Sequence, residues 1–263
     1  MNGMNVDCAA GGTTRSQGVG DGTPDGKRAR RRLNTLILFD IDGTLVLTGG
    51  AGGRAMRRAF TELFQITRFQ SLSMAGRTDR WIVSELAARH GVQLDDDAMT
   101  KVLDLYLKHL SQEMHVSGPG KRVLPGVEPL LGAMDSREDV HLALLTGNVE
   151  AGARIKLDYF DLWRYFAGGG YGDAAVDRTA LFAHALDSAA LHAGAAYQPA
   201  QVIIIGDTPF DIEVARASGA RSLGVATGNY DEEALRQAGA DAVLHDLSDL
   251  GAVMDAVGLA EPD

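Results

Sequence analysis

The sequence predicts an α/β protein whose core is a Rossmann-like open parallel sheet, with an α-helical domain inserted into that core. From residue 36 onward, short apolar runs alternate with segments of helical periodicity, which is typical of such sheets. Several runs lack polar alternation, as strands do when helices cover both faces of a sheet. Residues 52–118 break this order, because their spacing is helical throughout.

The predicted strands of the core are the short apolar runs 36–40, 140–147, 201–207, 221–227 and 241–245. The predicted helices lie between them, at 149–159, 179–193, 210–218 and 231–238. Gly219 and Gly239 follow the last two helices, and glycine readily adopts the left-handed conformation that ends a helix. The order of these elements therefore predicts crossover connections between parallel strands.

The chain divides into three parts in this interpretation. Residues 1–32 form a leader, residues 33–51 and 119–263 form the core, and residues 52–118 form the helical insert. Glycine-rich stretches, GGAGG and SGPGK, bound the insert and are suited to act as hinges. Because the insert follows the first strand and returns before the second, we expect it to cover the strand ends as a lid.

The leader has few large apolar side chains and ends in the basic run KRARRR. Such a composition predicts disorder, since little buried surface would offset the entropy of ordering. The basic run could bind nucleic acid or lipid, but we interpret it as a solvated charge cluster. The single cysteine, Cys8, also lies in the leader and is interpreted as incidental.

The composition of the 263 residues is that of a globular protein, with 45% hydrophobic and 23% charged residues. No apolar run reaches the length of a membrane span and no secretory signal is evident, so a soluble, cytoplasmic protein is expected. The formal net charge of -10 repels nucleic acid and anionic membranes, and neither is expected as a partner. The sequence leaves the oligomeric state open.

Polar residues follow three of the predicted strands at their carboxyl ends. In an open parallel sheet these ends form the ligand-binding crevice, so the side chains should converge there. The residues are Asp40, Asp42, Thr146, Asp207 and Asp211. Several carboxylates in one crevice repel each other unless a cation compensates them, and a set of oxygen ligands favours Mg²⁺.

Three motifs resemble, in the same order, the signatures of the haloacid dehalogenase (HAD) superfamily: DIDGTL at 40–45, TGN at 146–148 and GDTPFD at 206–211. The helical insert is similar to the type 1 cap of phosphoglycolate-phosphatase-like members. The resemblance implies the HAD fold and a Mg²⁺-dependent phosphatase that hydrolyses a small phosphomonoester through an aspartyl-phosphate. The expected partner is therefore a small phosphorylated metabolite.

The resemblance also implies catalytic roles. Asp40 would be the nucleophile, and Asp42 would protonate the leaving alcohol and later take a proton from water. Thr146 would hold a phosphoryl oxygen with its hydroxyl. Further contacts to the phosphate or substrate are implied for Gly43, Gly147 and Asn148.

The metal would be held by Asp40, Asp207 and the backbone carbonyl of Asp42. Asp211 lies one helical turn after Asp207, and would be a further ligand through water or would orient the other ligands.

The third motif of the superfamily, a lysine, has two candidates in this chain. Lys156 lies in the middle of a helical pattern, and we interpret it as a surface side chain. Arg178, just before a predicted helix, is preferred as a catalytic and phosphate-binding cation, because a planar guanidinium can bind phosphoryl oxygens in a bidentate manner.

In the insert, MAGRTD at 74–79 resembles the substrate loop of capped phosphatases. Arg77 in this loop, or Arg54 near the first motif, could bind a carboxylate or second phosphate of the substrate. An alternative remains open, in which Thr78 caps the following helix and Arg77 is solvated.

Other functions are weighed against phosphate hydrolysis. An acid at position 42 argues against a dehalogenase, and Lys101 and Lys108 look too solvated for a phosphonoacetaldehyde-type Schiff base. A phosphomutase of the beta-phosphoglucomutase type remains an alternative, as does a non-enzymatic receiver-like phospho-acceptor domain. Asp-x-Asp as a simple turn and GDTPFD as an ordinary helix start are the structural alternatives.

Overall fold

The computed structural model describes residues 35–173, 178–194 and 196–260. The chain divides into two units, 1–32 and 33–263, and the second contains all of the described residues. The predictions for the leader, its basic run and Cys8 lie outside the described residues. Within the described part of the chain, none of the helices combines the length and the hydropathy that crossing a membrane requires.

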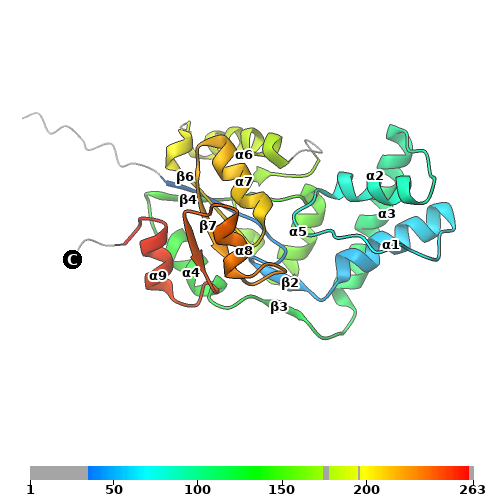
Figure 1. Cartoon of the computed structure of the whole chain (residues 1–263), viewed down its shortest axis with the longest axis horizontal. Coiled ribbons are helices and arrows are strands. Elements are labelled where there is room, and N and C mark those ends of the chain that lie inside the picture. The colour runs from blue at the N-terminus through cyan, green and yellow to red at the C-terminus, as the bar shows by residue number, and fades with distance from the viewer. Residues whose placement is uncertain (1–34, 174–177, 195, 261–263) are drawn as a thin grey trace, which may run out of the picture. The chain divides into compact units, whose positions relative to one another are not determined.

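The core is a six-stranded sheet in the order β5-β4-β1-β6-β7-β8, in which every neighbouring pair is parallel (Figure 1). The strands are β1 (Thr35–Phe39), β4 (Val140–Leu145), β5 (Gly169–Gly170), β6 (Val202–Gly206), β7 (Arg221–Val225) and β8 (Ala242–Leu244). The predicted α/β fold class is therefore confirmed. The edge strand β5 was not predicted, because two glycines carry no apolar signal.

Strand β1 lies at the centre and explains the missing polar alternation. It pairs with β4 on one side and β6 on the other, and Leu36 to Phe39 are fully buried. Ile37 and Phe39 belong to the apolar cluster on one face of the sheet, and Leu36 and Leu38 belong to the cluster on the other. Both faces need apolar side chains because helices cover both.

The helices of the core are α4 (Val127–Asp135), α5 (Glu150–Tyr159), α6 (Arg178–Ala193), α7 (Pro209–Ser218), α8 (Glu232–Gln237) and α9 (Leu250–Ala256). Helices α6 and α7 contribute to the cluster that holds Leu36, whereas α4, α5 and α9 contribute to the cluster that holds Ile37. Short 3-10 turns occupy Trp163–Tyr165 and Pro199–Gln201. Helices α4 and α9 were not predicted. Gly219 ends α7 with a φ of 73°, as its position suggested.

A two-stranded antiparallel ribbon connects the core with the helical insert. Strand β2 (Val46–Thr48) leads out of the core and β3 (Lys121–Val123) leads back, with Leu47 opposite Arg122. The chain is tightly packed beyond the ribbon, because a Cβ at Gly49 would lie 2.8 Å from the carbonyl oxygen of Pro119. The two ends of the insert therefore meet at one place.

The insert contains α1 (Ala51–Phe64), α2 (Asp79–Arg89) and α3 (Asp96–His115), which pack around an apolar cluster of their own. The cluster includes Met56, Phe60, Val83, Leu86, Val102, Tyr106 and Leu110. We call α1–α3 and the loops between them the cap. The prediction of helical structure throughout 52–118 is wrong for 65–78, which contains no helix; α1 ends where Gln65 adopts a left-handed φ of 58°.

Candidate active site

Three aspartates meet at the carboxyl edge of the sheet. Asp40 follows β1, Asp207 follows β6, and Asp211 lies in the first turn of α7. Each offers one carboxylate oxygen, and these oxygens lie within 4.8 Å of one another in a buried position. The strand register brings them together, because the N–H of Asp40 donates to the carbonyl oxygen of Ile205 at the end of the neighbouring strand.

Two of these carboxyl groups, those of Asp40 and Asp207, have strongly perturbed pKa values. Burial raises the pKa of Asp40 to about 7; the charge of Arg178 opposes this shift, and the nearby carboxylates add to it. Burial also raises the pKa of Asp207 to about 8, with further contributions from Asp40 and Asp211. Three buried acidic oxygens that destabilise one another are suited to a divalent cation such as Mg²⁺, whose preferred ligands are oxygens.

Arg178 is the cation beside Asp40. It is the first residue of α6, and its side chain is buried. Its Nη2 lies 2.9 Å from Asp40 Oδ1 and 2.5 Å from Asp211 Oδ1. Its Nε is buried and has no hydrogen-bond partner among the residues that the structure describes. The guanidinium thus compensates two carboxylates and keeps one donor for a further acceptor.

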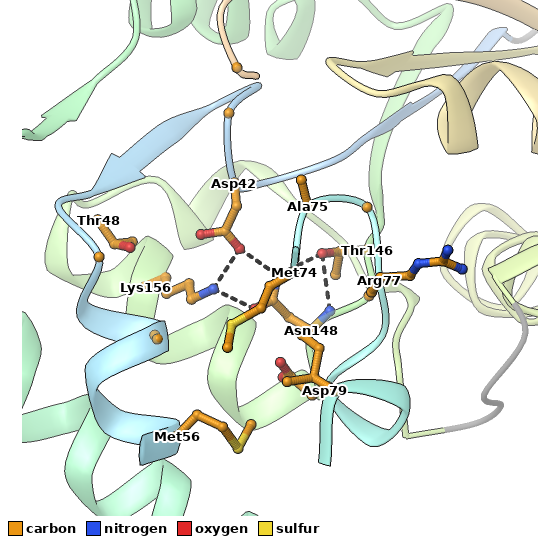
Figure 2. Close-up of a pocket in the computed structure, with 18 of the residues that line it drawn as sticks. Asp42, Thr48, Met56, Met74, Ala75, Arg77, Asp79, Thr146, Asn148 and Lys156 are labelled. Atoms are coloured by element: carbon orange, nitrogen blue, oxygen red, sulfur yellow. Dashed lines mark hydrogen bonds and ion pairs between the residues drawn. The ribbon is translucent and has the colours of Figure 1, made fainter. Parts of the chain in front are cut away.

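Lys156 also reaches the site, and its interpretation as a surface side chain is wrong. The residue is 4% exposed, and its Nζ lies 2.5 Å from both Asp42 Oδ2 and Asn148 Oδ1 (Figure 2). The signal that could have revealed this is helical spacing. Gly152, Ala153 and Leu157 form the buried face of α5 together with Lys156, so the lysine lies on the inner side of the helix.

Asn148 connects the second motif with Asp42. Its Nδ2 donates to Asp42 Oδ2 at 2.9 Å and to Thr146 Oγ1 at 2.8 Å, while its Oδ1 accepts from Lys156 (Figure 2). The ammonium of Lys156 can only donate, which fixes the orientation of the amide. Thr146 is fully buried. Sequence reasoning expected a backbone contribution from Asn148 and missed this side-chain network.

The two glycines of the predicted phosphate site have steric roles. The N–H of Gly43 donates to the carbonyl oxygen of Val46, and a Cβ at Gly43 would lie 2.5 Å from Asp207 Oδ2. A Cβ at Gly147 would lie 2.2 Å from the carbonyl oxygen of Arg77. Gly43 therefore makes room for the carboxylate of Asp207, and Gly147 makes room for the cap.

The motif GDTPFD at 206–211 both starts helix α7 and contributes to the site. Thr208 is the N-cap of α7 and Pro209 its first residue, as the structural alternative expected. Asp211 Oδ2 accepts from Thr208 N at 3.1 Å and from Thr208 Oγ1 at 2.7 Å, while its Oδ1 accepts from Arg178. These bonds hold the carboxylate of Asp211 next to Asp40 and Asp207.

A cavity of about 560 Å³ lies between this edge and the cap. Asp40, Asp42 and Asp207 line it from the core, together with Thr146, Asn148, Lys156 and Arg178. The cap contributes mainly apolar side chains, which include Met56, Leu72, Met74, Ile82 and Tyr106. In Figure 2, Met74 and Met56 are drawn below Asp42, and Met56 is the further of the two.

The two arginines predicted to bind substrate are engaged elsewhere. The guanidinium of Arg77 lies 4.5 Å from the ring centre of Trp81 and 4.3 Å from that of Phe210, and the side chain points away from Asp42 (Figure 2). Arg54 does not line the cavity; its Nε binds Glu113 Oε2 at 2.7 Å and its Nη1 binds the carbonyl oxygen of Gly49.

Of the alternatives for the loop 74–79, helix capping is present, because Thr78 Oγ1 accepts from Trp81 N. Arg77 is exposed, as that alternative expected, and its guanidinium also lies between the rings of Trp81 of the cap and Phe210 of the core. Arg77 therefore holds the cap against the motif GDTPFD at 206–211, which contains Phe210.

Asp79 attaches the loop 74–79 to the motif TGN at 146–148 and to the residue that follows it. Its N–H donates to the carbonyl oxygen of Gly147 at 2.8 Å, and its Oδ2 accepts from Val149 N at 2.9 Å. The hydroxyl of Tyr106 in α3 also binds its carboxylate. Burial raises the pKa of Asp79 to about 6, although the charge of Lys156 opposes the shift.

An open parallel sheet with acidic residues at its carboxyl edge and a helical cap defines a class of hydrolases. The family model described as haloacid dehalogenase-like hydrolase matches residues 37–225, and the chain belongs to this family. The resemblance drawn from the three motifs, the predicted fold and the prediction of a HAD-like hydrolase are thereby confirmed.

Two curated relatives extend over most of the chain. A phosphoglycolate phosphatase of Rhodospirillum rubrum is 28% identical over 235 residues, which cover 86% of this chain and 92% of that protein. A phosphoglycolate phosphatase of Agrobacterium fabrum is 29% identical over 223 residues, which cover 84% of this chain and 92% of that protein.

Solved structures support the fold. CbbY from Rhodobacter sphaeroides in complex with xylulose-(1,5)bisphosphate matches with a TM-score of 0.67 and 19% identity, covering 83% of this chain and 96% of that chain. A hydrolase from Pseudomonas syringae matches with a TM-score of 0.64 and 24% identity, covering 84% and 98% of the two chains. At these identities the likeness concerns the fold alone.

Proposed function

We propose that the protein is a Mg²⁺-dependent phosphatase that hydrolyses a small phosphomonoester through an aspartyl-phosphate at Asp40. One observation carries the proposal: Asp40, which lines the cavity, lies 2.9 Å from the buried guanidinium of Arg178 and offers a carboxylate oxygen within 4.8 Å of those of Asp207 and Asp211. The phosphoglycolate phosphatases among the relatives support the same reaction class.

In the first step, a carboxylate oxygen of Asp40 attacks phosphorus and the bond from phosphorus to the alcohol oxygen breaks. Asp42 gives its proton to that oxygen, so the leaving group departs as a neutral alcohol. Arg178 and the hydroxyl proton of Thr146 bind phosphoryl oxygens. Thr146 is suited to donate, because its oxygen already accepts from Asn148 N and Nδ2.

In the second step, water attacks the phosphorus of the aspartyl-phosphate. Asp42, now a carboxylate, takes a proton from the water, and the bond from phosphorus to the Asp40 oxygen breaks. Inorganic phosphate leaves, and both aspartates return to their starting forms. The cap side chains that line the cavity limit the access of bulk water to Asp40 and Asp42 during this cycle.

Mg²⁺ would be held by Asp40, Asp207 and the backbone carbonyl of Asp42, with Asp211 as a further ligand or as the group that orients the others. When bound, the ion would supply the positive charge that lets an anionic nucleophile approach an anionic phosphoryl group. The buried oxygens fit this role because burial, together with the repulsion between neighbouring carboxylates, raises the pKa values of Asp40 and Asp207.

Lys156 and Asn148 position the side chain of Asp42. Both contact the same oxygen, Asp42 Oδ2, and both are buried, whereas the Asp42 side chain is 43% exposed toward the cavity. The other oxygen of Asp42 can then serve the leaving group. A fixed acid is required at this point, because proton transfer depends on hydrogen-bond distance to the ester oxygen.

The proposal is tested by hydrolysis of p-nitrophenyl phosphate with and without Mg²⁺. We expect metal-dependent release of inorganic phosphate, and a loss of several orders of magnitude in Asp40→Asn, as removal of a nucleophile causes. Unchanged turnover in the variant would exclude Asp40 as the nucleophile. The two alternative functions give other results: a phosphomutase would transfer the phosphoryl group to a second phosphorylated substrate, and a receiver-like domain would not turn over.

A further inference from the structure

Arg57 of the cap lines the cavity and has no role in the proposed reaction. Four basic residues contribute to the described lining of the cavity, namely Arg57, Arg77, Lys156 and Arg178. Lys156 and Arg178 pair with aspartates, and Arg77 is stacked between two rings. The side chain of Arg57 has neither a hydrogen bond nor an ion pair to any described residue, and Arg57 is exposed.

Helix α1 places Arg57 apart from its basic neighbours. Arg54 and Arg58, four residues apart, share one face of the helix and both bind Glu113 of α3. Arg57 has no ion pair with Glu113. A Cβ built at Gly53 would lie 3.8 Å from Arg57 Nη1 and 4.0 Å from Met74 Sδ, so the guanidinium lies beside the cavity-lining Met74.

Apart from Arg77, which is stacked between two rings, and Asp79, which accepts from Val149 N, the rest of this wall is apolar, and the space is large. Met56, Leu72, Met74 and Ile82 line the cavity on the cap side, and Gly52 and Gly53 leave room because they carry no side chains. The cavity volume of about 560 Å³ lies within the range of pockets that enclose drug-sized ligands. A two-carbon phosphate ester would fill a small part of it.

We propose that Arg57 binds a carboxylate at the far end of the leaving alcohol, and that the substrates are phosphomonoesters whose phosphate and carboxylate are separated by an apolar spacer. One guanidinium matches one carboxylate in charge and in its paired donors, whereas a second phosphate would require more donors than this wall provides. The inference rests on the proposed phosphatase function, and it assigns Arg57 a role in substrate specificity.

The test uses two substrates that differ only in the distal charge, phenyl phosphate and 4-carboxyphenyl phosphate. We expect wild-type kcat/KM to be at least about tenfold higher for the carboxylated ester, the value of one charged hydrogen-bonded pair. In Arg57→Ala the ratio of the two kcat/KM values should fall to near one, and in Arg57→Glu it should fall below one. Arg58→Ala, which removes the same charge one residue further on, should keep the wild-type ratio.

A binding measurement provides a readout that does not depend on turnover. In the Asp40→Asn background, calorimetry should show tighter binding of 4-carboxyphenyl phosphate than of phenyl phosphate, and the added substitution Arg57→Ala should remove the difference. If wild type hydrolyses phenyl phosphate but the ratio does not depend on Arg57, this inference is wrong and the phosphatase function stands. If neither ester is hydrolysed, both proposals fail.

Discussion

The two walls of the cavity are built on different principles. On the core side, charged groups are paired and mostly buried: Arg178 binds Asp40 and Asp211, and Lys156 binds Asp42. On the cap side, the wall is mainly apolar: Arg77 is stacked between two rings, and the side chain of Arg57 has no partner among the described residues. In the function we propose, the core would serve one reaction, whereas the cap would select the leaving group.

Mutagenesis can separate the contributions of the two walls. Substitutions in the core should lower turnover of every phosphomonoester to the same extent. Substitutions in the cap should change KM, or the ratio between substrates, with smaller effects on kcat.

Asp207→Asn should reduce activity by at least about a thousandfold on every substrate, because it removes a proposed metal ligand. It should also stabilise the metal-free protein. The pKa of Asp207 is raised from 3.8 to about 8 in the folded state, so wild type loses stability as pH rises between these values. The variant does not ionise there, and its advantage should grow over the same interval.

Urea denaturation at pH 5 and pH 8, with and without Mg²⁺, measures this effect. The advantage of Asp207→Asn should be larger at pH 8 and should disappear when Mg²⁺ stabilises wild type. An advantage that is independent of pH would contradict the raised pKa, and equal stabilisation of both proteins by Mg²⁺ would contradict the metal site.

Lys156→Met should lower kcat about 10- to 100-fold, and equally for phenyl phosphate and 4-carboxyphenyl phosphate. Methionine roughly preserves the buried volume but no longer binds Asp42 and Asn148, so the acid is less well positioned. Lys101→Met is the control, because Lys101 is exposed and pairs with Asp97 on the cap surface. Steady-state kinetics that show an unchanged kcat would exclude a positioning role for Lys156.

Arg77→Ala should raise KM about 3- to 10-fold with little change in kcat, since a cation stacked on aromatic rings contributes about 0.5–2 kcal/mol. The alanine side chain is too short to stack on Trp81 in the cap or on Phe210 in the core, so the cap is held less firmly. Trp81 fluorescence should change as well, because the guanidinium no longer covers its ring. Arg80→Ala removes the same charge from α2 and should leave both quantities unchanged; a similar effect there would point to net charge alone.

Asp79→Asn should have the smallest effect, a gain of about 1 kcal/mol in the free energy of unfolding that is confined to higher pH. Burial raises the pKa of Asp79 from 3.8 to about 6, so wild type loses stability as pH rises through this range and the variant does not. Asparagine can still accept from Val149 N. Denaturation at pH 4 and pH 7.5 measures the difference. A loss of stability at pH 7.5 but not at pH 4 would contradict the prediction and show that the charge is required.

Sequence reasoning reached furthest where residue type and strand order determine position. The carboxyl ends of parallel strands lie at one edge of a sheet, so the sequence alone predicted that Asp40 and Asp207 lie close together. The predicted sheet was confirmed for the same reason, because buried strands have a strong apolar signal. The edge strand Gly169–Gly170 has none and was missed.

The positions of long side chains were harder to predict from the sequence, since the direction of such a side chain depends on tertiary packing. The spacing of Lys156 places it on the buried face of α5, although lysine is usually found at the surface. The prediction relied on the residue type more than on the spacing. Arg77 lines the cavity and Arg54 does not. The guanidinium of Arg54 binds Glu113, and that of Arg77 stacks on two aromatic rings. Arg57 could not be distinguished from Arg58 without the orientation of α1.

The ribbon of β2 and β3 has a consequence for how such an enzyme can diversify. The cap departs and returns through two paired strands, Val46–Thr48 and Lys121–Val123, neither of which is part of the six-stranded sheet. An entire cap can therefore be lengthened, shortened or exchanged while the two attachment points stay fixed. New substrates become accessible by grafting, and the machinery that cleaves the ester need not be rebuilt.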